Sequence, residues 1–305
     1  MSLAVSVFLL LLNLGGVGLA AWVLTLTVQR QRRGGLTLLA AWGLVAAALV
    51  TLQCLALGYA GGLNRWSLAA SSLALGLLAW RYAGRTGLRP VRTLRELAAS
   101  LRHGFKRLRR GHQVIALLIV LGLEFLLVVA LFAPPIDYDS LGYRLPRIAY
   151  WLQEGGIGHF PTFDERMNYS PLNGDLVMLW LTASFQVGFP LVKLVQFGAG
   201  GYVLLVTVLF ARRLGCRVGG QALAVLLVLS MPVFLAQMTT SQVGLWTAAM
   251  ALGGLFFLVE SLRGKASPWL AWLGLALAFG TTGTLLYWGP GLLLLGVAGL
   301  VLFRV

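Results

Sequence analysis

The segment that decides the fold is residues 112–135, HQVIALLIVLGLEFLLVVALFAPP. It is almost entirely apolar between His112 and Pro134, and Glu124 is the one acidic residue inside it. A helix needs about 20 apolar residues to cross a bilayer, so this run predicts a membrane span over residues 113–133. Pro134 and Pro135 end that helix because proline lacks the backbone N–H that the next helical turn needs.

The whole chain has the same character. Of its 305 residues, 59% are hydrophobic and 11% are charged, whereas about 25% are charged in a typical soluble domain. This composition excludes a soluble enzyme. Apolar runs predict nine spans, at residues 3–28, 36–60, 66–84, 113–133, 191–211, 219–236, 243–261, 268–285 and 287–303. A tenth run, 174–187, is too short to span and is expected to lie at the interface as a short helix.

The charge balance predicts the orientation. The chain has 24 Lys and Arg against 9 Asp and Glu, a net charge of +15. With nine spans most basic residues fall on one side, which the positive-inside rule assigns to the cytoplasm. The prediction is an all-α polytopic membrane protein of the bacterial inner membrane, with the N-terminus and a long loop, 134–190, outside. A nucleic-acid partner is not needed to explain the basic excess.

Three regions follow from this topology: a three-span region at 1–84, a basic linker at 85–112, and a transmembrane region at 113–305. In the linker, Leu94, Leu97, Leu101 and Phe105 recur at helical spacing among many cationic residues. A helix over 91–110 would be amphipathic, as is typical of a helix bound to anionic lipid at the cytoplasmic interface.

Six of the nine acidic residues fall between 137 and 175, inside the predicted outer loop. Asp137 and Asp139 follow the prolines directly and are expected just beyond the edge of the bilayer. Residues 143–153 form an amphipathic pattern with Arg144 and Arg147 on its polar side. Two carboxylates beside two guanidinium groups offer a general base and a phosphate clamp. Asp164, Glu165 and Asp175 are interpreted as solvated loop charges.

This loop resembles the first extracytoplasmic loop of the GT-C membrane glycosyltransferases, in the branch of protein mannosyltransferases and lipid A aminoarabinose transferases. The resemblance rests on DSLGY at 139–143, the glycine turn QEGG at 153–156, YSPL at 169–172 and LWL at 179–181. It continues more weakly through ARRLG at 211–215, SMPVF at 230–234 and residues 274–284. About two-thirds of the chain, from 113 to 303, is covered.

The resemblance implies transfer of a sugar from a polyprenyl-phosphate donor to a hydroxyl of a lipid, glycan or protein acceptor outside the cytoplasm. It implies Asp139 as the first choice for the catalytic carboxylate and Asp137 as the second. Arg144, Arg147 and Arg166 are the candidates for holding the donor phosphate. Tyr143 completes the motif as a substrate-binding candidate. No cofactor is specified, and a divalent metal held by His159 and the aspartates stays open.

Other interpretations stay open. Asp137 and Asp139 are also residues that cap helices, and the tyrosines near them also suit an interfacial aromatic belt. Glu124, at the middle of a span, is a candidate functional site, because an ionisable group at that depth is costly; a bond to another helix would also explain it. For the whole chain, the alternatives are a transporter or lipid flippase and an inactive GT-C-like scaffold.

Overall fold

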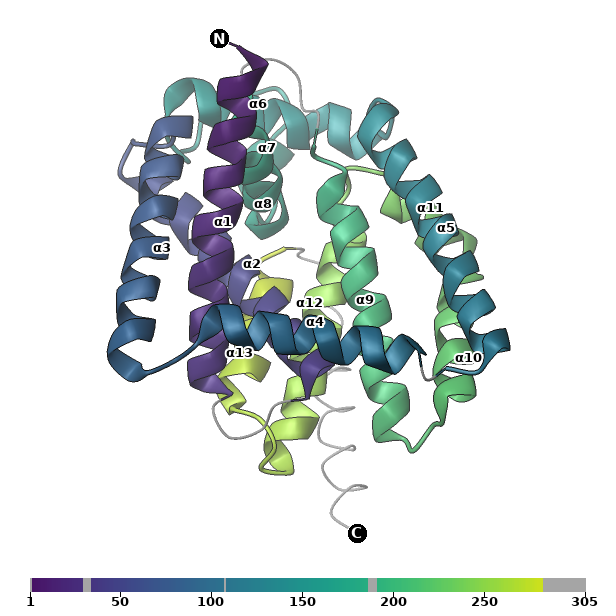
Figure 1. The fold of residues 1–305 in the computed structure, drawn as a ribbon. Helices are drawn as coiled ribbons and strands as arrows, with labels where there is room; N and C mark the ends of the chain where they lie inside the picture. Colours follow the sequence, from purple (N-terminus) through teal and green to yellow (C-terminus); the bar gives the residue numbers. More distant parts are fainter. Residues whose placement is uncertain (1, 30–33, 107, 186–190, 282–305) are drawn as a thin grey trace.

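The computed structural model describes residues 2–29, 34–106, 108–185 and 191–281. Every regular element in these ranges is helical, and they contain no strand. The elements are α1 (Leu3–Val28), α2 (Gly35–Tyr59), α3 (Arg65–Thr86), α4 (Pro90–Lys106), α5 (Arg110–Phe132), the π-helix η1 (Ser140–Arg144), α6 (Leu145–Glu154), α7 (Arg166–Tyr169), α8 (Asn173–Thr182), α9 (Leu194–Arg213), α10 (Val218–Leu229), α11 (Pro232–Met238), α12 (Gly244–Leu262) and α13 (Pro268–Phe279). Most of the long helices run along one direction (Figure 1), so the molecule is a helical bundle.

Five helices are long and apolar enough to cross a bilayer, namely α1, α2, α5, α9 and α12. They indicate a multi-pass membrane protein, so the all-helical membrane fold is confirmed at this level. The prediction of nine spans is not confirmed, because the described residues hold five such helices, or up to six if α10 and α11 count as one. α3 covers the predicted run 66–84 without being among the five, and the predicted span 287–303 lies outside the described residues.

The predicted span 219–236 is broken in two. α10 ends at Leu229 and α11 begins at Pro232, and the two helices are bent by 76° relative to each other. Proline is tolerated as the first residue of a helix, where its missing N–H has no partner to lose, but it cannot continue the preceding helix. The single apolar run therefore forms two short helices that meet at Ser230 and Met231.

Small residues bring two helix pairs into close contact. A Cβ atom on Gly16 of α1 would lie 2.1 Å from the carbonyl oxygen of Ser72 in α3, and one on Gly254 of α12 would lie 2.8 Å from the backbone nitrogen of Leu275 in α13. Glycine removes these clashes and lets the backbones approach, a common device between helices in membranes. α1 and α3 lie side by side in Figure 1.

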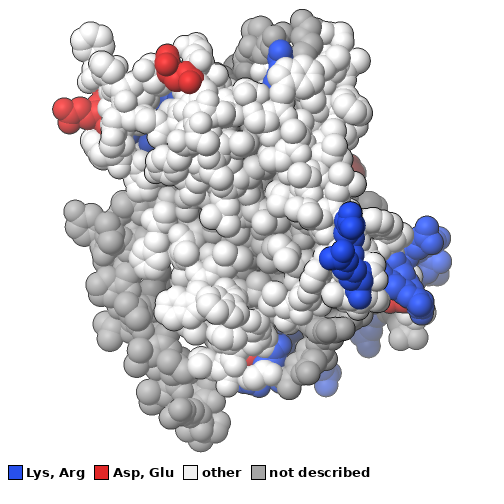
Figure 2. Space-filling model, turned by 90° about the vertical axis from the view of Figure 1, so that its left-hand side faces the viewer, with Lys and Arg blue, Asp and Glu red and all other residues white. Residues whose placement is uncertain are grey.

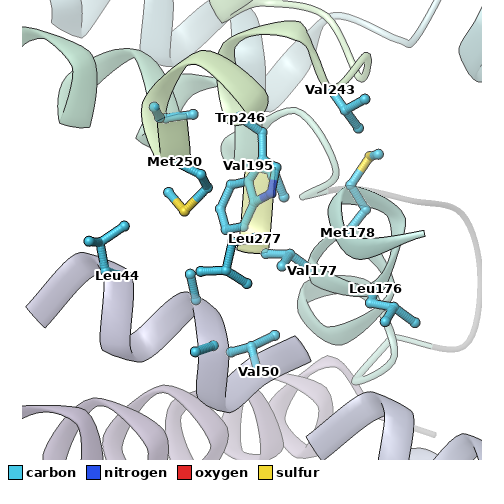
Figure 3. Packing of buried hydrophobic residues seen from close by; sticks show 14 of the residues in the cluster. Leu44, Val50, Leu176, Val177, Met178, Val195, Val243, Trp246, Met250 and Leu277 are labelled. Atoms are coloured by element: carbon cyan, nitrogen blue, oxygen red, sulfur yellow. The ribbon is translucent and has the colours of Figure 1, made fainter. Parts of the chain in front are cut away.

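The run 174–187 was predicted to be a short helix at the interface, and the structure describes it as far as residue 185. It forms α8, most of whose residues are buried inside the bundle, and Figure 3 places Met178 of α8 in one apolar cluster with Trp246 of α12, Leu277 of α13 and Val50 of α2. The indole N–H of Trp180 donates a 2.8 Å hydrogen bond to the side-chain oxygen of Gln53. The burial of this helix depends on contacts with other helices, which its composition alone does not reveal.

The turn after α6 fastens the loop region to α2. Gly155 ends α6 with φ of 69°, a left-handed conformation that glycine adopts readily. Its carbonyl oxygen accepts a 2.7 Å hydrogen bond from the N–H of Leu63, and the N–H of Ile157 donates to the carbonyl oxygen of Gly58 at 3.2 Å. The predicted glycine turn is thus present, and it holds α6 against the end of α2.

α4 crosses the bundle at the end opposite α6 and α7 (Figure 1), and we call this the basic end. The indole N–H of Trp22 in α1 donates a 3.1 Å hydrogen bond to the carbonyl oxygen of Pro90, the first residue of α4. Figure 2 shows most of the visible Lys and Arg side chains in the lower half of the molecule, where the basic end lies. Acidic side chains are visible near the top. We call this opposite end, which contains α6 and α7, the loop end. The belt between them shows few charges, as expected for a membrane protein.

Candidate functional site

Asp137 joins two parts of the loop end. Its carboxylate accepts a 3.0 Å hydrogen bond from the backbone N–H of Ser140 and another from the Ser140 hydroxyl, so it holds the first residue of η1. The other carboxylate oxygen lies 3.4 Å from both the backbone nitrogen and the hydroxyl of Ser241, which precedes α12. The Ser241 hydroxyl also donates to the Ser140 hydroxyl at 2.8 Å. Asp137 therefore has the helix-holding role that the sequence left open, and it also links α5 to α12.

Asp139 is in a different position, because its side chain is 44% exposed and accepts no hydrogen bond from any described residue. Its Oδ1 lies 3.6 Å from Nη1 of Arg166. Arg166 is held by Asp164 through Nε at 2.9 Å and Nη2 at 2.6 Å. The same guanidinium lies over the rings of Tyr143 and Tyr138, 4.7 and 5.3 Å from their centroids. Three predicted site residues, Asp139, Arg166 and Tyr143, are thus adjacent.

The charges of this group influence one another. Hydrogen bonds from Arg166 hold the pKa of the Asp164 carboxyl below its usual range, and the same contacts raise the pKa of the Arg166 guanidinium. Burial raises the pKa of the Tyr143 phenol. At neutral pH the group therefore carries one guanidinium cation and the carboxylate of Asp164, with Asp139 beside them.

Arg144 and Arg147 face inward. Nη1 of Arg144 lies 2.8 Å from one carboxylate oxygen of Asp175, and Nη2 of Arg147 forms an ion pair with the other. Arg147 is 1% exposed and also donates a 2.7 Å hydrogen bond to the carbonyl oxygen of Ser170. Asp175 is fully buried, so its interpretation as a solvated loop charge is wrong. This ion triad joins η1 and α6 to the first turn of α8.

Lys193 is a cation at this end that the sequence analysis did not select. It lies at the start of α9 and is 5% exposed. Burial lowers the pKa of its amine, and the carboxylate of Asp137 acts in the opposite direction. Within the described ranges no carboxylate is close enough to form an ion pair with it. The sequence feature that could have identified Lys193 is its position as a single lysine between two apolar runs.

Glu124 is exposed on the outer surface of α5 and lies apart from the loop residues. Leu121 and Val128, one turn away on either side, are 51% and 53% exposed. No described residue forms a hydrogen bond or an ion pair with Glu124. A bond to another helix of this chain is therefore absent from the described part.

A metal site was left open by the sequence. Within the described residues, no three His, Cys, Asp or Glu side chains are grouped so that they could hold an ion, and His159 is exposed. Comparisons with protein-family models, curated proteins and solved structures gave no match. The structure itself therefore defines the class of protein. It is a helical multi-pass membrane protein with a cluster of carboxylates and cations at its loop end.

Proposed function

We propose that this protein is a membrane glycosyltransferase that moves a sugar from a polyprenyl-phosphate donor to an acceptor hydroxyl at the loop end. The observation that carries the proposal is the state of Asp139: a half-exposed carboxylate, without a hydrogen-bond donor among the described residues, 3.6 Å from a guanidinium. A general base must reach solvent and its substrate, and it must not already be saturated by internal hydrogen bonds. Asp137 and Asp175 do not meet this requirement.

The reaction assigns a role to each charge. The acceptor oxygen forms a bond to C1 of the sugar while the bond from C1 to the donor phosphate oxygen breaks. The hydroxyl proton passes to Asp139, and polyprenyl phosphate leaves with the electron pair. Positive charge must neutralise the phosphate as it departs. Arg166 is paired with Asp164, but its side chain is 31% exposed, so its guanidinium can also contact a phosphate beside Asp139, with Tyr143 supporting it.

Arg144 and Arg147 are less suited to bind the phosphate than their positions in the sequence suggest. Both are bound to Asp175, and withdrawing either would leave a buried carboxylate with one partner fewer, which is costly. We assign them to positioning, because they hold α6 and η1 where Asp139 and Arg166 meet. Lys193, buried near Asp137, adds positive potential to the same end.

The experiment uses purified protein in nanodiscs with radiolabelled polyprenyl-phosphate sugars and a mixture of lipid and hydroxyl acceptors. The proposal predicts label in the acceptor and one polyprenyl phosphate released for each sugar transferred. Heat-treated protein and the Arg166→Gln variant serve as controls. Absence of transfer with every donor and acceptor, from protein that remains folded, would contradict the proposal.

A transporter is the second candidate, favoured by one observation. α10 and α11 form a span broken at a 76° bend, and α8 is a short buried helix; discontinuous helices of this kind often surround transport sites. A transporter would move a lipid-linked or soluble sugar across sealed vesicles and leave the substrate chemically unchanged. Movement without consumption of the lipid-linked donor would favour this candidate over transfer.

A further inference from the structure

A cavity of about 560 Å³ lies at the basic end, between α4, α5, α9 and α10. Its walls are largely apolar, with Leu101 and Phe105 from α4, Ile115 and Ile119 from α5, Val208 from α9 and Val225 from α10. The volume falls within the range of about 300–1,000 Å³ that is usual for small-ligand sites. It is separate from the loop end, so nothing in the proposed transfer reaction uses it.

α4 covers this cavity with half of its apolar stripe. In the first half, Leu97 is 8% exposed and packs against Trp22 and Leu38, whereas Leu94 is 45% exposed. Leu101 and Phe105, in the second half, remain 44% and 48% exposed although they lie on the same stripe. α4 is also tied to α5, because the side-chain amide of Gln113 donates a 3.2 Å hydrogen bond to the carbonyl oxygen of Phe105. The second half of the helix thus presents an apolar surface that this chain leaves uncovered in its described part.

The polar lining of the cavity is positive. Arg212, His112 and Gln221 line it together with Ser100, and no Asp or Glu is among its described lining residues. Nε of Arg212 donates a 2.9 Å hydrogen bond to Gln221, which orients the guanidinium. Arg212 forms no ion pair with any described carboxylate. The two acidic residues of the basic end are already engaged, Glu96 with Arg92 and Glu260 with Arg213.

We propose that this cavity binds one anionic phospholipid. An acyl chain occupies the apolar space beneath Leu101 and Phe105, and the headgroup phosphate binds Arg212 beside His112. Charge complementarity selects this occupant, because an apolar cavity whose polar groups include an unpaired guanidinium matches a molecule with a hydrocarbon chain and a phosphate anion. A bound lipid would also cover Leu101 and Phe105, the exposed residues of the α4 stripe that line the cavity.

The test measures lipid retained by the purified full chain in native mass spectrometry after exchange into mild detergent with equal phosphatidylglycerol and phosphatidylcholine. We expect one phosphatidylglycerol retained per chain, in clear preference to phosphatidylcholine. Arg212→Gln removes a charge-assisted contact and should weaken retention about tenfold or more. Arg81→Gln, an exposed arginine outside the cavity lining, is the matched control and should retain the lipid.

A second pair of variants tests the cavity itself. Ala222→Trp places a large ring in the lining of the cavity, whereas Leu223→Trp places the same ring at a position that is 57% exposed and outside the lining. We expect retention to be lost in the first and kept in the second. Equal retention in both tryptophan variants, or equal retention of the two lipids by the wild type, would overturn the proposal. If Ala222→Trp fails to fold, the comparison of Arg212→Gln with Arg81→Gln decides alone.

Discussion

Asp137 and Ser241 are separated by 104 positions in the chain, and a carboxylate oxygen of Asp137 lies 3.4 Å from both the backbone nitrogen and the hydroxyl of Ser241. Asp137 follows α5 and Ser241 precedes α12, so this contact fixes one end of α12 to the loop that carries Asp139. The loop end is therefore held by specific polar contacts in addition to the packing of the helices.

The first prediction concerns this link. Asp137→Ala leaves the polar groups of Ser140 and Ser241 without their acceptor and should lower the free energy of unfolding by about 1–3 kcal/mol. Ser241→Ala should cost about 1 kcal/mol, and the double variant should cost less than the sum because the residues interact. Denaturant titration in detergent measures all three. Thr239→Ala, in the same turn but bonded only to Ala236, should be additive with Asp137→Ala. Strict additivity of the Asp137 and Ser241 variants would refute the link.

The second prediction concerns the buried ion triad. Asp175→Asn preserves the size of the side chain but leaves Arg144 and Arg147 charged inside the protein, which should destabilise it by about 3–5 kcal/mol. The thermal midpoint of unfolding in detergent reports this loss. Asp164→Asn, in a partly exposed pair with Arg166, is the control and should change the midpoint far less, because solvent screens the pair. Equal midpoints for wild type and Asp175→Asn would mean that the triad does not hold the loop.

The third prediction concerns pH. Hydrogen bonds from Arg166 hold the folded pKa of Asp164 below its unfolded value, which is about 3.9. The contribution of this pair to stability is therefore present above that value and is lost as the pH falls through the lower, folded pKa. The carbon resonance of the Asp164 carboxyl group, followed by NMR, should titrate at lower pH in the wild type than in Arg166→Gln. Identical midpoints in the two proteins would contradict the geometry of the pair.

The fourth prediction concerns Glu124, which faces outward on α5. Glu124→Leu should favour insertion of the isolated α5 segment by about 3 kcal/mol in a translocon assay, because an ionisable group at the centre of a span is costly. In the whole protein the same change should leave the thermal midpoint unchanged or raised, since no described residue is bonded to Glu124. Leu121→Ala, one turn away on the same surface, is the control for a change of side chain on this surface that removes no charge. A large destabilisation by Glu124→Leu would reveal a partner for the carboxyl group.

Hydrophobic runs predicted much of the fold. The bounds of α1, α2, α5, α9 and α12 lie within a few residues of predicted spans, because a helix that crosses a bilayer needs about 20 predominantly apolar residues. α4 was predicted for a similar reason, from the spacing of its apolar residues. The break between α10 and α11 was not predicted, although Pro232 is visible in the sequence. A proline can kink a helix or end it, and the local sequence does not indicate which of the two occurs.

The contacts of the predicted site residues differ in how far the sequence could indicate them. Asp139 and Tyr143 belong to one short motif, but Arg166 reaches them from further along the same loop. The partner of Asp137 is Ser241, 104 positions away, and the partner of Arg147 is Asp175, on the helix that follows the loop. Asp175 begins an apolar helix, and its composition gave no indication that the acid would be buried between two arginines. Long-range ion pairs of this kind depend on the packing of α6 against α8 and cannot be read from either segment alone.

The most direct test of the proposed function is the rate of sugar transfer by Asp139→Asn compared with Glu165→Gln. Both changes remove one carboxylate from the loop, but Glu165 is exposed and has no side-chain contact in the described residues. Loss of a general base should lower the rate by about 10²–10⁴-fold, so we predict that loss for Asp139→Asn and a nearly unchanged rate for Glu165→Gln. Equal rates for Asp139→Asn and the wild type would contradict the account.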